Sequence, residues 1–165
     1  IVIMTIAMTY GASASANARG VGLGIAGGLA YSPTTLDNVQ REAIGTSVSW
    51  GFFVDIPLRK SFYISPAAMI YELDLGSGPK PVTDIDINFK FIVPVGPVSL
   101  GAGVTTGLTV AEERYAGHWG LLGYASHNLV SNLDVFLLAQ YKRLVRSKGD
   151  AVDDIHGYAG AMFRF

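Results

Sequence analysis

Few residues of the chain could do catalytic or metal chemistry, and their spacing argues against both. Ser126 and His127 are adjacent, but acyl transfer needs a serine and a histidine within hydrogen-bond reach, with an acid that orients the histidine. Adjacent residues of a strand point to opposite faces, so these two would not meet on a strand. Neither His118 nor His156 has a serine two residues away, although two aspartates precede His156. Three histidines without a recurring spacing, and no cysteine, predict no metal site. We therefore predict no catalytic residue and no cofactor.

Charged residues recur instead at inward-facing positions of the segments described below. The candidate network comprises Asp55, Asp84, Asp86, Lys90, Asp134, Lys142, His156 and Arg164. Position along the segments places Asp55, Lys90, Asp134 and Arg164 near one end of the fold and the other four near the opposite end. Each level carries both signs of charge, which predicts an internal plug of ion pairs that satisfies buried charge. A narrow ion path with a gate is the alternative.

Composition and alternation indicate the elements that position these residues. Half of the residues are apolar and only 15% are charged, well below the roughly 25% of soluble domains, and mean hydropathy is +0.35. No apolar run after the N-terminus is long enough for a membrane-spanning helix, whereas bulky and small or polar residues alternate with the period of two of a strand. Eight strands are predicted, at residues 19–32, 44–56, 61–73, 82–93, 98–111, 118–128, 133–143 and 154–165. The facing of 61–73 and 118–128 is not clear, and Pro66 suggests a bulge.

Side-chain size predicts how the eight strands are arranged. Eight strands enclose an interior barely wide enough for side chains, which suits the set rich in glycine, alanine and serine. The bulky set would then face outward, and only lipid tolerates such an apolar outer surface. In a soluble barrel of the lipocalin type, apolar residues face inward and polar residues face water. Closure is required because an open edge in hydrocarbon leaves backbone groups unpaired. We predict an all-β fold, a closed eight-stranded antiparallel up-and-down transmembrane β-barrel.

The N-terminal segment 1–18 is typical of a secretory signal peptide. A short apolar run precedes small residues with A-x-A spacing, and candidate cleavage sites follow Ala14, Ala16 and Ala18. The basic start of such a peptide is missing, so we expect the segment to be truncated at its start. A membrane anchor or a buried strand is the alternative. The predicted barrel domain comprises residues 19–165.

The C-terminus carries a pattern that resembles a known assembly signal. The stretch Tyr158-x-Gly160-x-x-Phe163-x-Phe165 resembles the C-terminal β-signal of bacterial outer-membrane proteins, which the barrel-assembly machinery recognises. With the eight strands, it makes residues 19–165 similar to the small eight-stranded outer-membrane barrels of the OmpA transmembrane domain and OmpX type. This resemblance implies outer-membrane lipid and the assembly machinery as partners and a monomeric protein. A net charge of −1 without a basic block predicts no nucleic-acid partner.

The connections predict topology and register. Short connections at 57–60, 94–97 and 129–132 alternate with longer ones at 33–43, 74–81, 112–117 and 144–152, as in membrane barrels. The short turns and both termini would be periplasmic. A last hairpin centred on Gly149 would place Asp134 opposite Arg164, Gln140 opposite Tyr158, Lys142 opposite His156, Val135 opposite Phe163 and Leu137 opposite Ala161.

For function, these observations favour a structural or surface-interaction barrel. A narrow ion-conducting pore is the alternative, and a lipid-modifying enzyme of the outer membrane is the third and least favoured hypothesis.

Overall fold

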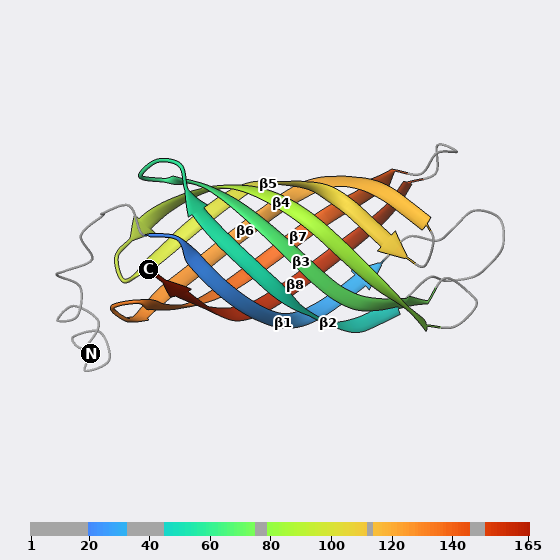
Figure 1. The fold of residues 1–165 in the computed structure, drawn as a ribbon, viewed down its shortest axis with the longest axis horizontal. Helices are drawn as coiled ribbons and strands as arrows, with labels where there is room; N and C mark the ends of the chain where they lie inside the picture. The colour runs from blue at the N-terminus through green and yellow to red at the C-terminus, as the bar shows by residue number, and fades with distance from the viewer. Residues whose placement is uncertain (1–19, 33–44, 75–78, 112–113, 146–150) are drawn as a thin grey trace, which may run out of the picture.

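The protein is a closed antiparallel β-barrel of eight strands. The computed structural model describes residues 20–32, 45–74, 79–111, 114–145 and 151–165. The strands are β1 (Gly22–Ser32), β2 (Gly45–Pro57), β3 (Phe62–Asp74), β4 (Pro79–Val95), β5 (Val98–Ala111), β6 (Arg114–Val130), β7 (Leu133–Val145) and β8 (Ala151–Arg164). Each pairs with the next in sequence, and β8 pairs with β1 to close the barrel (Figure 1). The predicted closed barrel is confirmed, and the described residues contain no helix that could cross a membrane. The predicted signal peptide lies outside them.

Side chains alternate between a buried interior and an exposed outer surface. The exposed set includes Leu23, Ile25, Phe52, Ile85, Phe89, Leu108 and Leu121. The two strands of unclear facing follow the same rule: β3 buries Tyr63 and Met69, and β6 buries His118 and Tyr124. The outer surface is therefore apolar around the barrel, as the distribution of bulky residues predicts.

The prediction of a bulge at Pro66 is wrong. Phe53 pairs with Ala67 on one side of the proline and Ile56 with Ile64 on the other, in one unchanged register. Pro66 itself is exposed on the outer face and is aligned with Ile87 of β4. A proline lacks the N–H of a ladder bond, and here the β2–β3 pairing is interrupted locally without an inserted residue.

Both ends of the barrel have a distinct character. The turns at 58–61, 96–97 and 131–132 lie at the end that also holds the C-terminus (Figure 1), which we call the turn end; the opposite end is the loop end. Gly96 has φ of 62° and takes the first position of a two-residue hairpin turn, where a left-handed residue is needed.

Three loops are shorter than predicted because their strands continue further. Only residues 112–113 separate β5 from β6, only 75–78 separate β3 from β4, and only 146–150 separate β7 from β8. Strands β4 and β6 have 17 residues each. At about 3.3 Å per residue, the height of these strands along the barrel axis exceeds the apolar band of a membrane barrel, about 25 Å, even when the strands are tilted. The barrel wall therefore extends beyond such a band.

The predicted register of the last hairpin is wrong by two residues. Asp134 pairs with Met162 rather than Arg164, and the whole ladder is shifted accordingly. The observed pairs are Gln140 with His156, Lys142 with Asp154, Val135 with Ala161 and Leu137 with Ala159. A shift of two keeps each side chain on its face, so facing alone does not determine this register. The predicted centre, Gly149, lies outside the described residues.

Candidate functional site

The eight residues of the candidate network all lie buried inside the barrel. Seven of them are at most 3% exposed, and Arg164 is 8% exposed. They come from β2, β4, β7 and β8 and divide into two groups along the barrel axis. The structure brings the members of each group together by the contacts described next.

The turn-end cluster consists of Asp55, Lys90, Asp134 and Arg164. Lys90 Nζ donates to Asp55 Oδ1 over 2.5 Å. The guanidinium of Arg164 lies between two carboxylates: its Nε is 2.5 Å from Asp134 Oδ2, and its NH2 nitrogen is 3.2 Å from Asp55 Oδ2. Two cations thus face two carboxylates, which compensates the buried charge and ties four strands together across the interior.

An aromatic ring and an amide complete this cluster. The ammonium of Lys90 lies 4.6 Å from the centroid of the Tyr124 ring, a favourable cation–π distance. Asn128 Nδ2 donates to Asp134 Oδ1 over 2.9 Å. The carboxylate of Asp134 is therefore held by two donors on two different strands.

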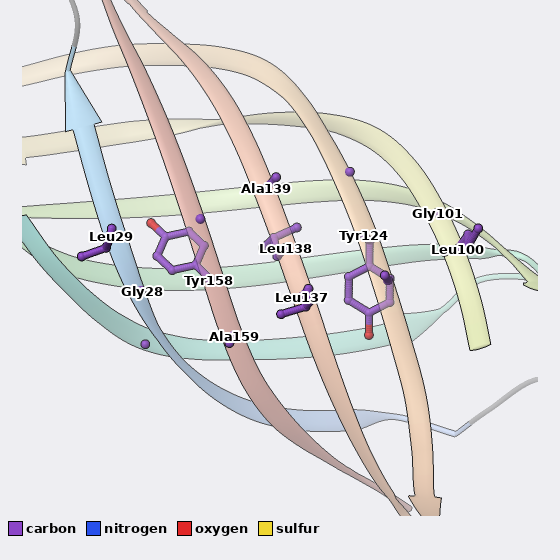
Figure 2. A pocket seen from close by; sticks show the side chains of 14 residues that line it. Gly28, Leu29, Leu100, Gly101, Tyr124, Leu137, Leu138, Ala139, Tyr158 and Ala159 are labelled. Atoms are coloured by element: carbon purple, nitrogen blue, oxygen red, sulfur yellow. The ribbon is translucent and has the colours of Figure 1, made fainter. Parts of the chain in front are cut away.

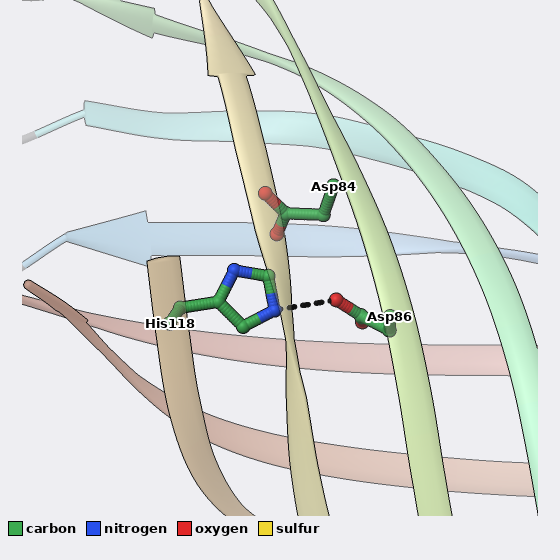
Figure 3. A group of neighbouring side chains, drawn as sticks. All are labelled: Asp84, Asp86 and His118. Atoms are coloured by element: carbon green, nitrogen blue, oxygen red, sulfur yellow. Dashed lines mark hydrogen bonds and ion pairs between the residues drawn. The ribbon is translucent and has the colours of Figure 1, made fainter. Parts of the chain in front are cut away.

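The loop-end cluster is centred on Asp84, Asp86, His118 and Lys142. Lys142 Nζ donates to Asp84 Oδ2 and to Asp86 Oδ2, both over 2.7 Å. His118 Nε2 is 2.7 Å from Asp86 Oδ1 (Figure 3). Tyr71 donates its hydroxyl to the Asp84 carboxylate, at 3.3 Å from each oxygen. This cluster joins β3, β4, β6 and β7, so Lys142 reaches across the interior from the far wall.

His156, the remaining residue of the predicted network, lies beside this cluster. Its ring centroid is 5.1 Å from that of Tyr71, and its Nδ1 is 2.6 Å from the Tyr158 hydroxyl. Asp154, two residues along β8, is also buried. Among the described residues, the loop end thus contains three buried carboxylates, one lysine and two histidines, whereas the turn end has two cations and two carboxylates.

An apolar and amide layer separates the two clusters. Gln140 Nε2 donates to Asn88 Oδ1 over 2.9 Å, and Asn88 Nδ2 donates to the Ser65 carbonyl over 3.1 Å. Phe53 and Phe136 pack edge to face, with ring centroids 5.5 Å apart. Other buried members of this layer are Met69, Leu122, Tyr124, Leu138, Tyr158 and Met162.

The absence of a side chain at Gly107 leaves space for the His118 ring. A Cβ on Gly107 would lie 2.0 Å from the Ile85 carbonyl oxygen and 2.8 Å from His118 Nε2. No side chain fits there without displacing backbone. Glycine at this position therefore allows the His118–Asp86 contact to form directly against the wall.

Two kinds of chemistry can be considered for the loop-end cluster. Asp84, Asp86 and His118 offer metal-ligand atoms that lie within 4.8 Å of one another, but the Lys142 ammonium already bridges both carboxylates. Thr109 Oγ1 lies 2.9 Å from His118 Nδ1, which gives a row of hydroxyl, imidazole and carboxylate. All three groups are buried, so the row serves as a hydrogen-bonded brace between β4, β5 and β6.

The adjacent serine and histidine of β6 do not form a catalytic pair. Ser126 is buried, whereas His127 is exposed on the outer face. His127 Nδ1 lies 2.8 Å from the Pro97 carbonyl oxygen. The opposite facing expected for adjacent strand residues is observed.

Sequence reasoning missed part of the interior. His118 was outside the predicted network because 118–128 has apolar residues on both faces. Asp154 lies two residues before His156 and therefore on the same face of the strand, which is a signal that could have added Asp154 to the predicted network. Large aromatic residues such as Phe53 and Phe136 also fill the interior, although small side chains were expected there.

The residues of the predicted assembly signal lie on both faces of β8. Tyr158 faces the interior and is buried, and Gly160 lies on the same face. Phe163 and Phe165 face outward, with ring centroids 5.0 Å apart at an interplanar angle of 72°. Their exposed rings mark the turn end of the outer surface.

Comparison with one solved structure supports the fold. The crystal structure of Neisserial surface protein A (NspA) superposes with a TM-score of 0.69, at 13% identity, over 88% of this chain and 97% of that one. The attachment invasion locus protein Ail of Yersinia pestis, solved with the heparin analogue sucrose octasulfate, gives 0.48 at 16% identity, over 88% of this chain and 99% of that one. No family model matches, and no curated protein matches. The expected resemblance to small eight-stranded outer-membrane barrels is confirmed at the level of the fold.

Proposed function

We propose that the chain is an integral protein of the bacterial outer membrane, with a plugged interior and a structural or surface-interaction role. The observation that carries this proposal is the inversion of an ordinary core: Asp84, Asp86 and Lys142 are buried, while Leu23, Phe52 and similar residues are exposed. Water does not tolerate such a continuous apolar surface, and hydrocarbon does. A closed barrel is also one of two backbone arrangements that can span a bilayer.

Two observations support a plug rather than a pore. The clusters at the two ends and the aromatic layer between them join side chains from opposite walls, as in the contact between Lys142 of β7 and Asp84 of β4. The lysines and the arginine of the two clusters have their carboxylate partners inside the barrel, where eight strands leave little free space.

Planar-bilayer recordings test the plug directly. The purified protein, refolded without residues 1–18 in detergent, should insert without discrete conductance steps, while an open porin in the same bilayers gives them. Regular steps from this chain would favour the narrow pore.

Refolding itself should give a β-type circular dichroism spectrum and faster gel migration before boiling than after. A water-soluble monomer without detergent would contradict membrane residence.

The termini are proposed to face the periplasm. In membrane barrels the short turns are periplasmic, and here they share one end with the C-terminus (Figure 1). An epitope inserted at Arg59–Lys60 of the turn end should be detected only after cells are permeabilised, whereas one inserted within 146–150 should be detected on intact cells. The reverse pattern would overturn this orientation.

The remaining assignments belong to the same proposal. Residues 1–18 act as a signal peptide, the terminal motif recruits the assembly machinery, and the barrel is monomeric. No catalysis is proposed, because Thr109, His118 and Asp86 are buried and contact one another. Mass analysis of lipid A from cells with and without the protein would reveal a lipid-modifying activity if there were one.

A further inference from the structure

The outer wall of the barrel has a hollow that the interior network does not explain. It extends over β5, β6, β7, β8 and β1 and has a volume of about 830 Å³. Leu29 and Leu100 lie at its two sides, and Ala139 and Ala159 lie between them (Figure 2). At about 4.8 Å per strand, five neighbouring strands span roughly 19 Å, which is wider than one hydrocarbon chain.

The floor of the hollow consists of small outward-facing residues. Gly123 of β6, Ala139 of β7 and Gly157 of β8 are direct cross-strand neighbours in one row. A Cβ added to Gly123 or Gly157 would meet no atom within 4 Å, so the space above the backbone is open. Two other hollows on the outer wall, of about 400 and 380 Å³, are each about half this volume, so this row is the floor of the larger recess.

A cationic side chain lies on the same wall, beyond the loop-end side of the hollow. Arg143 faces outward on β7, four residues from Ala139, which is about 13 Å along the strand. Its side chain is 47% exposed, and its Nε is 3.9 Å from Asp153 Oδ1. Tyr141 donates its hydroxyl to the same Asp153 oxygen over 2.9 Å. The 3.9 Å distance to Asp153 makes a weak pair and leaves guanidinium N–H groups for a second anion.

We propose that this wall binds a phosphorylated glycolipid with several acyl chains, from the outer leaflet of the outer membrane. The acyl chains lie in the hollow over Gly123, Ala139 and Gly157, and a headgroup phosphate accepts hydrogen bonds from Arg143. The inference rests on the proposed function, which places the loop end at the outer leaflet. An arginine fork matches phosphate geometry, and the distance from Ala139 to Arg143 suits a lipid whose chains and phosphate are joined.

A second copy of the chain would fit this wall less well. A symmetric dimer through this face would bring one hollow against the other, and the two floors would remain unfilled. Unfilled apolar space forfeits the dispersion contacts that close packing provides. Flexible acyl chains can fill such a recess.

Native mass spectrometry of the refolded protein in detergent tests the proposal. The probe is purified bisphosphorylated lipid A, with phosphatidylglycerol as the comparison lipid. Ala139→Leu fills the hollow, and Ala68→Leu is the matched control on the exposed face of β3. We expect Ala139→Leu to lower lipid A retention about tenfold, equivalent to 1.4 kcal/mol, and Ala68→Leu to leave it unchanged.

The charged residues give an independent readout. Arg143→Gln should lower retention of lipid A, whereas Arg59→Gln at the exposed turn end should not. Asp153→Asn should raise retention, because it removes a negative charge beside the bound phosphate. If Ala139→Leu fails to fold, Arg143→Gln and Asp153→Asn still decide the question.

The outcomes separate this inference from the proposed function. Equal lipid A retention by all folded variants, equal preference for phosphatidylglycerol, or a dimer lost on Ala139→Leu would each overturn the lipid site while the membrane barrel stands. Failure of the wild type to refold in detergent would instead overturn the proposed function.

Discussion

Asp134 and Arg164 form a 2.5 Å ion pair although they are not partners in the β7–β8 ladder. Asp134 is aligned with Met162, so Arg164 is its diagonal neighbour two residues further along β8. Diagonal neighbours are about 7–8 Å apart at Cα, a gap that a long side chain can cross. The flexible reach of arginine therefore maintains a contact that the register does not provide.

The Arg164 guanidinium should matter more than the Asp134 carboxylate. Arg164→Gln leaves two carboxylates without this cation and should lower the free energy of unfolding by about 3–5 kcal/mol. Asp134→Asn should cost less, because Arg164 keeps its contact with Asp55. Urea unfolding of the refolded protein in detergent measures both. The double variant should lose less than the sum of the singles, and additive losses would show that the pair is not coupled. A larger loss from Asp134→Asn than from Arg164→Gln would contradict the expected order of the two residues.

Lys142 should be the most sensitive residue of the loop-end cluster. Lys142→Met keeps the length of the side chain but removes the only lysine that faces Asp84 and Asp86 in the described part of the chain. Leaving buried carboxylates uncompensated should cost about 3–5 kcal/mol. Lys60→Met, at an exposed turn, is the control and should change stability little. Adding Asp84→Asn to Lys142→Met should recover part of the loss in the same urea titration; no recovery would argue against the charge explanation.

Period-two alternation was sufficient to predict the eight strands and the facing of six of them, while the facing of β3 and β6 stayed open. The closed barrel followed from side-chain size and from the need to pair every strand edge in hydrocarbon. The alternation determines which face a side chain takes, as with Lys90 and Asp134. Because an even shift keeps every side chain on its face, the alternation does not determine the register. The pairing of Asp134 with Met162 could therefore not be predicted from the pattern. Pairing of β8 with both β7 and β1 adds a constraint that a single hairpin does not contain.

The content of the interior was harder to predict than its boundary. Phe53 lies between two other apolar residues, Phe52 and Val54, so composition gave no sign that it faces inward. Leu122 and Tyr124 of β6 are similar cases. Contacts such as the one between Lys142 and Asp84 join strands that are not neighbours, and such contacts depend on barrel closure and side-chain length rather than on local sequence.

Gly107 should not accept a side chain. Gly107→Ala places a Cβ 2.0 Å from the Ile85 carbonyl oxygen, so β4 and β5 must separate or His118 must move. The yield of heat-modifiable, folded protein should fall sharply on refolding. Gly123→Ala is the matched control, since its added Cβ meets no atom within 4 Å. Equal yields for the two variants would mean that the wall at Gly107 is looser than the structure indicates.

The terminal aromatic pair should act in assembly more than in stability. Phe165 is 72% exposed, and burying such a ring in a membrane contributes about 1.5–3 kcal/mol. Phe165→Ala, and more strongly deletion of 163–165, should lower the amount of folded protein in the outer membrane of cells. Phe91→Ala is the control, because Phe91 is also exposed on the outer face but lies outside the terminal motif. A reduced level only for the terminal variants, at similar refolding yields in detergent, indicates lost recognition. Wild-type levels after the deletion, or an equal loss with Phe91→Ala, would contradict the assembly role.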